Sequence, residues 1–384
     1  MNFSLTDEQV MIQQTARDFA ESEILPDASA RDKKGEFPHD IVRKLGELGF
    51  MGMMVPPEHG GSGLDTVSYV LAVMEISRVD ASVGVIMSVN NSLVCYGLEK
   101  YGSSYIKEKY LRPLAAGEKL GAFALSEPEA GSDATQQKTT AEKQDDYYIL
   151  SGSKNWITNG TTADYFIVMA STDKSQRHKG ITAFLVEKGW DGFEHGAKED
   201  KLGIRSSDTC SLSFTGCEVP AVNIIGETGR GFNYAMDTLN GGRIGIAAQA
   251  TGIAQASLDS SVKYANERKA FGKPIAGLQA IQFKIAEMAV KTDAAKLLTL
   301  QAASLKDAGR DYHMEAAMAK LYASRIAVEA ALDAIQIHGG YGYVREYQVE
   351  RYLRDSKITE IYEGTSEIQK LVIARALQTQ AGQL

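Results

Sequence analysis

Hydrophobic residues recur at helical spacing in the first and last thirds of the chain, beginning where Thr6 and Gln9 form a capping-box pattern. We expect Pro26 to kink or end the first helix. The predicted helices cover residues 6 to about 30, 37 to 49 or 52, 65–99, 103–116, about 231–267, 278–308 and 314–338, with one more after Glu363.

Between residues 121 and 220 the helical period gives way to short runs of residues that favour β-strands. These runs are 147–150, 164–170, 181–186 and 210–214, separated by Gly, Asn and Asp turns. The alternation in Ser211-Leu-Ser-Phe214 predicts a strand with one face in water. The middle of the chain should therefore be a compact β domain.

The predicted fold is mainly α with a central, barrel-like β domain. We expect an N-terminal helical domain (residues 1–120), a middle β domain (121–228) and a C-terminal four-helix bundle (229–384). Long Ala-rich helices pack closely, and the two helical regions are expected to flank the β domain.

Composition narrows the class of protein. Hydrophobic residues make up 44% and charged residues 23%, as in ordinary globular proteins, and the net charge of −8 disfavours nucleic-acid binding. The three cysteines follow no metal-ligand spacing and cannot all pair, which predicts no metal site and a reducing compartment. No stretch approaches 18 uninterrupted apolar residues, and the N-terminal sequence has no secretory or transit pattern, so we expect a cytoplasmic protein without membrane insertion.

Glu363 is the strongest candidate for chemistry, because it stands between an aromatic residue and a glycine. Gly364 tolerates a positive φ, and Thr365 can open a new helix. Apolar neighbours such as Ile361 and Ile368 would withdraw water and raise the pKa of the carboxyl toward that of a general base. A solvated turn glutamate is the alternative on local evidence.

The run Ile361-Tyr-Glu-Gly-Thr-Ser-Glu-Ile-Gln369 resembles the catalytic motif of acyl-CoA dehydrogenases, closest to the short-chain, butyryl-CoA type. Other segments resembling that family follow in its order along nearly the whole chain. The resemblance implies that Glu363 removes the α-proton of an acyl-CoA thioester while hydride passes to N5 of FAD. It also implies electron transfer to electron-transfer flavoprotein.

The resemblance extends to two sets of FAD-binding segments. Within one subunit it assigns Phe123, Leu125, Ser126, Gly131, Ser132, Trp156, Ile157, Thr158, Thr365 and Glu367. A second set reaches the FAD of a neighbouring subunit, which implies a homotetramer: Arg268, Phe271, Leu278, Gln279, Gln336, Gly339 and Gly340. Local evidence alone favours Trp156 as a core residue in a strand, and the other motifs in register favour the flavin contact instead. His338 is interpreted as structural.

Substrate contacts implied by the resemblance are Ser132, Asn240, Arg243 and Gly364. Isovaleryl and long-chain branches of the family carry their catalytic Glu immediately before the position of Arg243, whereas this chain has Gly242. That difference leaves Glu363 as the only base of the family pattern.

The acyl pocket is less well determined by the sequence. Met51, Met53, Met54, Met74 and Met87 could line it or could fill the core, and the helix from Val70 to Met87 is the expected closure. Alternative functions are a branched short-chain dehydrogenase, a physiological enoyl-CoA reductase, an acyl-CoA oxidase and a non-enzymatic flavin-binding assembly protein.

Overall fold

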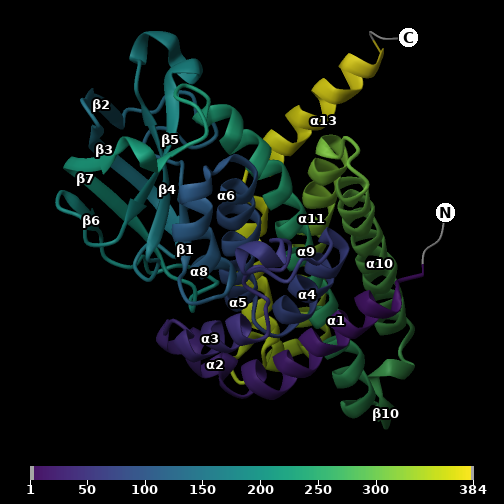
Figure 1. Ribbon diagram of the computed structural model, residues 1–384. Coiled ribbons are helices and arrows are strands. Elements are labelled where there is room, and N and C mark those ends of the chain that lie inside the picture. Colours follow the sequence, from purple (N-terminus) through teal and green to yellow (C-terminus); the bar gives the residue numbers. More distant parts are fainter. Residues whose placement is uncertain (1–3, 382–384) are drawn as a thin grey trace.

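The computed structural model describes residues 4–381, and most of them are helical (Figure 1). The N-terminal region opens with a capping box, in which Thr6 accepts from the Gln9 N–H and the Gln9 side chain accepts from Thr6 N–H. Its helical segments are α1 (Asp7–Phe19), η1 (Ala20–Ile24), α2 (Leu25–Lys34), α3 (His39–Glu47), α4 (Thr66–Val79), α5 (Ala81–Ser88), η3 (Val89–Cys95), α6 (Tyr96–Tyr101), α7 (Ser104–Ile106), η4 (Lys107–Leu111) and α8 (Arg112–Ala115).

Pro26 does not end the first helix, which continues from α1 through η1 into α2. The segment η1 is a π-helix, and the Leu25 N–H donates to the carbonyl of Ala20. The wider turn accommodates the proline ring, which would clash with the carbonyl four residues earlier in a regular α-helix. Pro113 follows the π-helix η4 in the same way.

The helix predicted over residues 65–99 is broken at Asp80. This residue is extended (φ −147°, ψ 104°), and its carboxylate accepts from the Ser82 N–H at the start of α5. The guanidinium of Arg31 lies 3.3 Å from the same carboxylate. This ion pair between distant segments stabilises the extended conformation of Asp80 between α4 and α5. Apolar residues on both sides conceal it in the sequence.

Eight strands of the middle region form one sheet within the described residues. They are β1 (Gly121–Ala124), β2 (Thr140–Gln144), β3 (Tyr147–Thr158), β4 (Tyr165–Ser171), β5 (Ile181–Glu187), β6 (Phe193–His195), β7 (Thr209–Pro220) and β8 (Ile224–Ile225). The order is β6-β7-β3-β2-β4-β5-β8, and β1 pairs in parallel with β4. The four predicted runs lie in β3, β4, β5 and β7, whereas β1, β2, β6 and β8 were not predicted.

The sheet has its own hydrophobic core. Side chains from its strands form one buried cluster around Phe166, Phe184 and Phe193, separate from the larger cluster of the helices. The rings of Phe193 and Phe214 stack with centroids 5.1 Å apart. The proposed domain divisions at residues 120 and 228 fall immediately before β1 and shortly after β8.

The C-terminal region is a bundle of long helices. Its elements are α9 (Gly231–Glu267), the hairpin β9 (Lys269–Ala270) and β10 (Lys273–Pro274), α10 (Gln279–Asp307), α11 (His313–His338), η8 (Gly339–Tyr343), α12 (Val349–Ser356), η9 (Lys357–Glu360) and α13 (Ser366–Ala381). The mainly α fold with a central β domain is confirmed. The two helical regions do not flank the sheet, because α4 and α5 pack directly on α9 while the sheet lies to one side (Figure 1).

One helical stretch, Ala81–Tyr101, is long and apolar enough to cross a membrane by those two criteria alone. Its most apolar window is 94% buried within the protein. That burial fits a central core helix, whose side chains pack against the surrounding helices rather than against lipid.

Candidate active site

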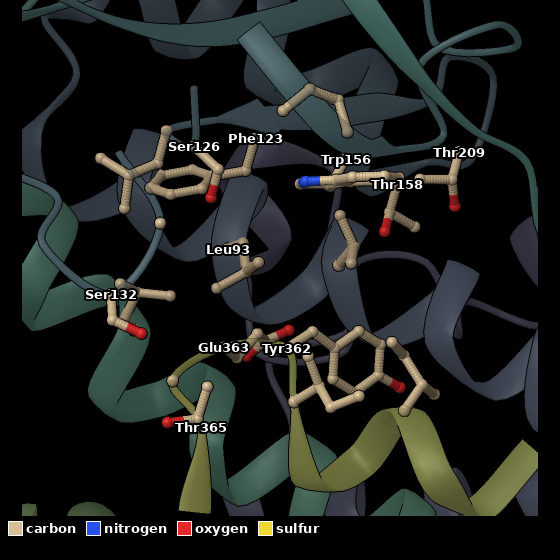
Figure 2. Close-up of a pocket in the computed structure, with 18 of the residues that line it drawn as sticks. Leu93, Phe123, Ser126, Ser132, Trp156, Thr158, Thr209, Tyr362, Glu363 and Thr365 are labelled. Carbon is tan, nitrogen blue, oxygen red and sulfur yellow. The ribbon is translucent and has the colours of Figure 1, made fainter. Parts of the chain in front are cut away.

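A cavity of about 850 Å³ lies between the β domain and the C-terminal helices. Figure 2 shows the rings of Phe123 and Trp156 on one side of it and Glu363 with Tyr362 on the opposite side. Of the residues predicted from the sequence, the cavity brings together Phe123, Leu125, Ser126, Gly131, Ser132, Trp156, Ile157, Thr158, Arg243, Glu363, Gly364 and Thr365.

Trp156 reaches the cavity because β3 is irregular at this point. The pairing of β3 with β7 shifts register between Lys154 and Ile157, and Trp156 has a φ of +62°. Its side chain is 62% exposed and lines the cavity, so it is not a core residue. Ring contacts with a planar ligand would satisfy this exposed aromatic surface.

Glu363 occupies a strained turn. It has a φ of +52°, which is unfavourable for a residue with a Cβ, and Gly364 follows with a φ of +95°. The Thr365 hydroxyl then accepts from the Ile368 N–H and caps α13. The turn therefore directs the carboxylate into the cavity immediately before the helix begins (Figure 2).

The carboxylate of Glu363 lies in unusual surroundings. Its Oε2 atom is buried and has no hydrogen-bond partner among residues 4–381. Burial raises the pKa of the Glu363 carboxyl to about 7, and the positive charges of Lys320 and Arg243 oppose that rise. A pKa in this range suits a general base at neutral pH.

Gly242 and Arg243 on α9 face the same carboxylate. A Cβ atom on Gly242 would lie 2.1 Å from Oε2 of Glu363, so no larger residue fits unless the carboxylate moves. Burial lowers the pKa of Arg243, whose Nη1 donates to Oδ1 of Asn240 at 2.6 Å. Asn240 thus orients Arg243 and is not itself part of the cavity lining in the described chain.

A second cavity of about 630 Å³ collects part of the predicted subunit-bridging set. Arg268, Gly339 and Gly340 line it, and the guanidinium of Arg268 lies 5.4 Å from the ring centre of Tyr341. His338 is also in the lining, where it stacks on Tyr264 at 4.1 Å and shares a 2.8 Å hydrogen bond with the Ala334 carbonyl. Burial lowers the pKa of His338, and these contacts favour its structural interpretation.

The remaining predicted residues lie outside both cavities. Phe271 is 91% exposed at the turn between β9 and β10, Leu278 and Gln279 stand at the start of α10, Gln336 is near the end of α11, and Glu367 is exposed in the first turn of α13. Phe271 therefore presents its ring at the protein surface.

The methionines and the helix Val70–Met87 do not form the cavity wall. Met51, Met53, Met74 and Met87 are buried in the core, and none of the five methionines considered is among the lining residues in the described chain. Val89 and Leu93 supply the apolar wall instead. Both belong to the π-helix η3, and such turns are frequent at functional sites.

Several other residues that line the cavity had no predicted role. These include Thr209, Phe232, Met236, Leu239, the segment 199–204, Arg354 and Ile358. Ordinary helix and strand patterns carry no signal for them.

No group of three or more His, Cys, Asp or Glu side chains in the part of the chain that the structure describes could hold a metal ion.

The larger cavity fits the isoalloxazine end of FAD. It presents an exposed indole ring with the hydroxyl group of Thr158 next to it, and the hydroxyl group of Ser126 lies near the ring of Phe123 (Figure 2). Neither hydroxyl has a side-chain hydrogen bond within residues 4–381, so both are available to a ligand. A flat aromatic surface with adjacent polar groups is what a flavin ring system requires.

Comparison with known proteins agrees with this geometry. Three family models match in order: the acyl-CoA dehydrogenase N-terminal domain over residues 6–118, the middle domain over 122–217 and the C-terminal domain over 229–378. The chain is 55% identical to the rat (Rattus norvegicus) mitochondrial short-chain specific acyl-CoA dehydrogenase over 364 residues, covering 95% of this chain and 88% of the rat protein.

Solved structures give the same result. The butyryl-CoA dehydrogenase of Megasphaera elsdenii has a TM-score of 0.97 and 47% identity, covering 98% of this chain and 100% of that one. A chain from the structural study of the electron transferring flavoprotein of Acidaminococcus fermentans has a TM-score of 0.97 and 50% identity, covering 98% and 99%. The chain therefore belongs to the acyl-CoA dehydrogenase family and is an FAD-dependent oxidoreductase that acts on acyl-CoA.

Proposed function

We propose that this enzyme dehydrogenates short-chain acyl-CoA thioesters to trans-2-enoyl-CoA, with Glu363 as the α-proton acceptor. The observation that carries the proposal is the carboxylate of Glu363, which is buried in the cavity with no partner for Oε2 in the described chain. A buried carboxylate without a partner costs free energy, and an enzyme retains such a cost where the group performs chemistry.

The residues of the chain have complementary parts in the reaction. The Glu363 carboxylate takes the proton from the α-carbon and becomes a neutral acid, which suits its apolar surroundings. Arg243 places a positive charge near the carboxylate, and apolar side chains such as Leu93 exclude water from the reacting carbons. When bound, FAD supplies the acceptor for the hydride that leaves the β-carbon.

The residues that would hold FAD fall into the two sets already placed. The proposed flavin contacts are Phe123, Leu125, Ser126, Gly131, Ser132, Trp156, Ile157, Thr158, Thr365 and Glu367. Across a subunit boundary, Arg268, Phe271, Leu278, Gln279, Gln336, Gly339 and Gly340 would reach the dinucleotide, with Arg268 suited to pyrophosphate. Ser132, Asn240, Arg243 and Gly364 are the proposed substrate side.

The short-chain assignment is supported by relatives and by the cavity wall. The rat relative is named short-chain specific, and the Megasphaera elsdenii structure is a butyryl-CoA dehydrogenase. Val89 and Leu93 come from the buried helical segment η3, which cannot move away without disturbing the core. We propose that they end the acyl pocket.

We further propose a homotetramer that passes electrons to electron-transfer flavoprotein. The Acidaminococcus fermentans match supports that partner. Self-association is supported by large apolar side chains that remain exposed on the C-terminal helices, namely Phe283, Val290, Leu297, Leu332 and Leu371. Three buried cysteines without disulfides favour a cytoplasmic location.

The direct test is anaerobic mixing of the purified yellow enzyme with butyryl-CoA while flavin absorbance is followed. Glu363→Gln should retain FAD and bind acyl-CoA yet reduce the flavin at least about a thousandfold more slowly than wild type. Reduction at a near-normal rate in this variant would eliminate Glu363 as the base. Wild-type flavin that butyryl-CoA does not bleach would contradict the proposed short-chain dehydrogenation.

A second measurement tests the direction of the reaction and the identity of the electron acceptor. Steady-state turnover with electron-transfer flavoprotein, with oxygen and in the direction of enoyl-CoA reduction separates a dehydrogenase from an oxidase and from a physiological reductase. We expect turnover to be fastest with electron-transfer flavoprotein. Fast reoxidation by oxygen alone would favour the oxidase.

A further inference from the structure

Lys320 is a buried lysine that no part of the reaction described so far uses. It lies on the inner face of α11 and its side chain is fully buried, with 0% exposure. Its ammonium group donates to the carbonyl oxygen of Gly364, the residue directly after Glu363. A lysine from another helix is thus attached to the turn that carries the proposed base.

Comparison with Lys154 shows why this contact is unusual. Lys154 is equally buried, but its ammonium group forms an ion pair with Glu127 at 2.8 Å. Among residues 4–381, no carboxylate oxygen lies within 4.0 Å of the Lys320 ammonium nitrogen, so Lys320 forms no ion pair there. Lysines are almost never fully buried unless they are paired, so the position of Lys320 requires an explanation beyond packing.

The Gly364 carbonyl receives two donors. Besides Lys320, the Nε2 atom of Gln369 donates to it at 2.8 Å, and Gln369 is also fully buried. The two donors fix the carbonyl of a turn in which Glu363 and Gly364 both have positive φ angles. Gln369 contributes a neutral hydrogen bond, whereas Lys320 adds a positive charge.

We propose that Lys320 is a positioning residue for the reaction: its ammonium group holds the Gly364 carbonyl and supplies the positive charge that keeps the neighbouring Glu363 carboxylate ionised. This proposal rests on the proposed role of Glu363 as the base. Removing the charge should make Glu363 harder to ionise, and removing only the hydrogen bond should not.

The electrostatic surroundings agree with this role. The charged groups that act on Lys320 are Glu363 on the turn, Arg243 on α9, Glu360 on η9 and Glu367 on α13, and burial is the largest effect. Burial lowers the pKa of Lys320 to about 7 and raises the pKa of Glu363 to about 7. For Glu363, Lys320 is the largest opposing influence, ahead of Arg243.

The test measures Glu363 itself as well as the reaction. Infrared difference spectra of the FAD-loaded enzyme, recorded against Glu363→Gln to assign the carboxyl band, give the pKa of Glu363 without turnover. Stopped-flow flavin reduction by butyryl-CoA gives the pH profile of the chemical step. Both are measured in wild type, Lys320→Met, Lys320→Arg and Gln369→Leu, with FAD content and thermal melting to verify folding.

We expect Lys320→Met to raise the pKa of Glu363 by about one pH unit or more, because an adjacent opposite charge is worth about one to three. The acid limb of the reduction profile should move upward with it, lowering the rate about tenfold or more on that limb. Lys320→Arg keeps the positive charge, so the pKa of Glu363 should return most of the way to its wild-type value. Gln369→Leu should leave the pKa of Glu363 close to wild type.

Failure of this proposal is distinguishable from failure of the proposed function. An unchanged Glu363 pKa in Lys320→Met, or an equal shift in Gln369→Leu, would overturn the role of Lys320. A shifted pKa with an unshifted reduction profile would overturn Glu363 as the base instead. If Lys320→Met does not fold, a wild-type pKa and profile in Lys320→Gln would overturn the proposal.

Discussion

Gly242→Ala should slow flavin reduction about a hundredfold without unfolding the enzyme. The added Cβ would lie 2.1 Å from Oε2 of Glu363 and 2.7 Å from Cδ2 of Leu93, whereas ordinary contact begins at 3.4 Å. Relief of the closer contact therefore requires a displacement of 1.3 Å (3.4 − 2.1). Both contacting atoms are the far ends of side chains, so the backbone can remain in place while the carboxylate moves.

The expected effect on stability is modest. Replacing a helical glycine by alanine stabilises a helix by about 0.5–1 kcal/mol, whereas moving the ends of Glu363 and Leu93 off their rotamers costs about 0.5–1.5 kcal/mol for each side chain. The net loss is therefore roughly 0–2.5 kcal/mol. The effect on chemistry is large, because a displacement of about 1 Å at a reacting group can cost roughly a hundredfold in rate. Flavin reduction by butyryl-CoA should fall by about that factor.

Gly241→Ala is the matched control. It adds the same methyl group one position earlier on α9, where the Cβ would meet only Nζ of Lys306, at 3.6 Å. Both variants should retain FAD. Gly241→Ala should melt near or slightly above the wild-type temperature and Gly242→Ala at or somewhat below it, and only Gly242→Ala should lose stopped-flow reduction rate. Equal rates in the two variants would refute the reasoning, as would a Gly242→Ala crystal structure with Glu363 unmoved.

Two further predictions concern substrate length and assembly. Turnover measured as kcat/KM from C4 to C16 should peak at four to six acyl carbons, and Leu93→Ala should move the optimum to longer chains, because each newly accommodated methylene contributes about 0.8 kcal/mol. A wild-type maximum at C8 or beyond would contradict the short-chain assignment. Arg268→Ala should lose FAD and dissociate in sedimentation experiments, since a bidentate charged contact is lost, while the exposed neighbour Lys269→Ala should do neither. An Arg268→Ala variant that stays fully loaded with FAD and sediments like wild type would count against a site shared between subunits.

The helical part of the fold was largely predictable because its hydrophobic period extends over many turns. The long C-terminal helices α9, α10 and α11 lie close to their expected ranges. Short strands were missed for the opposite reason: β8 has two residues and β6 has three, too few to show alternation. The break at Asp80 was missed because Arg31, which holds it, is distant in the sequence.

The candidate site was predictable only where residues form a recognisable run. Trp156 illustrates the limit, since its local sequence favours a buried strand residue, whereas the register shift in β3 exposes it. Leu93 lies in an apolar helix whose sequence does not indicate which side chain meets the cavity. The proposed roles of the site residues come from the resemblance to a family and not from hydrophobic periodicity. The apolar wall of the cavity, by contrast, became visible only in the packed structure.

The turn at Glu363 connects these observations. Its geometry depends on Gly242 from α9, which leaves room for the carboxylate, and on Lys320 from α11, which binds the following carbonyl. The hydrophobic pattern of neither helix indicates these contributions. Gly242 contributes by having no side chain, and Lys320 is a single polar group on an apolar helix face. The environment of the proposed base is therefore a property of the assembled bundle, and the pKa of Glu363 should respond to substitutions on helices that contribute no group to the proposed proton transfer.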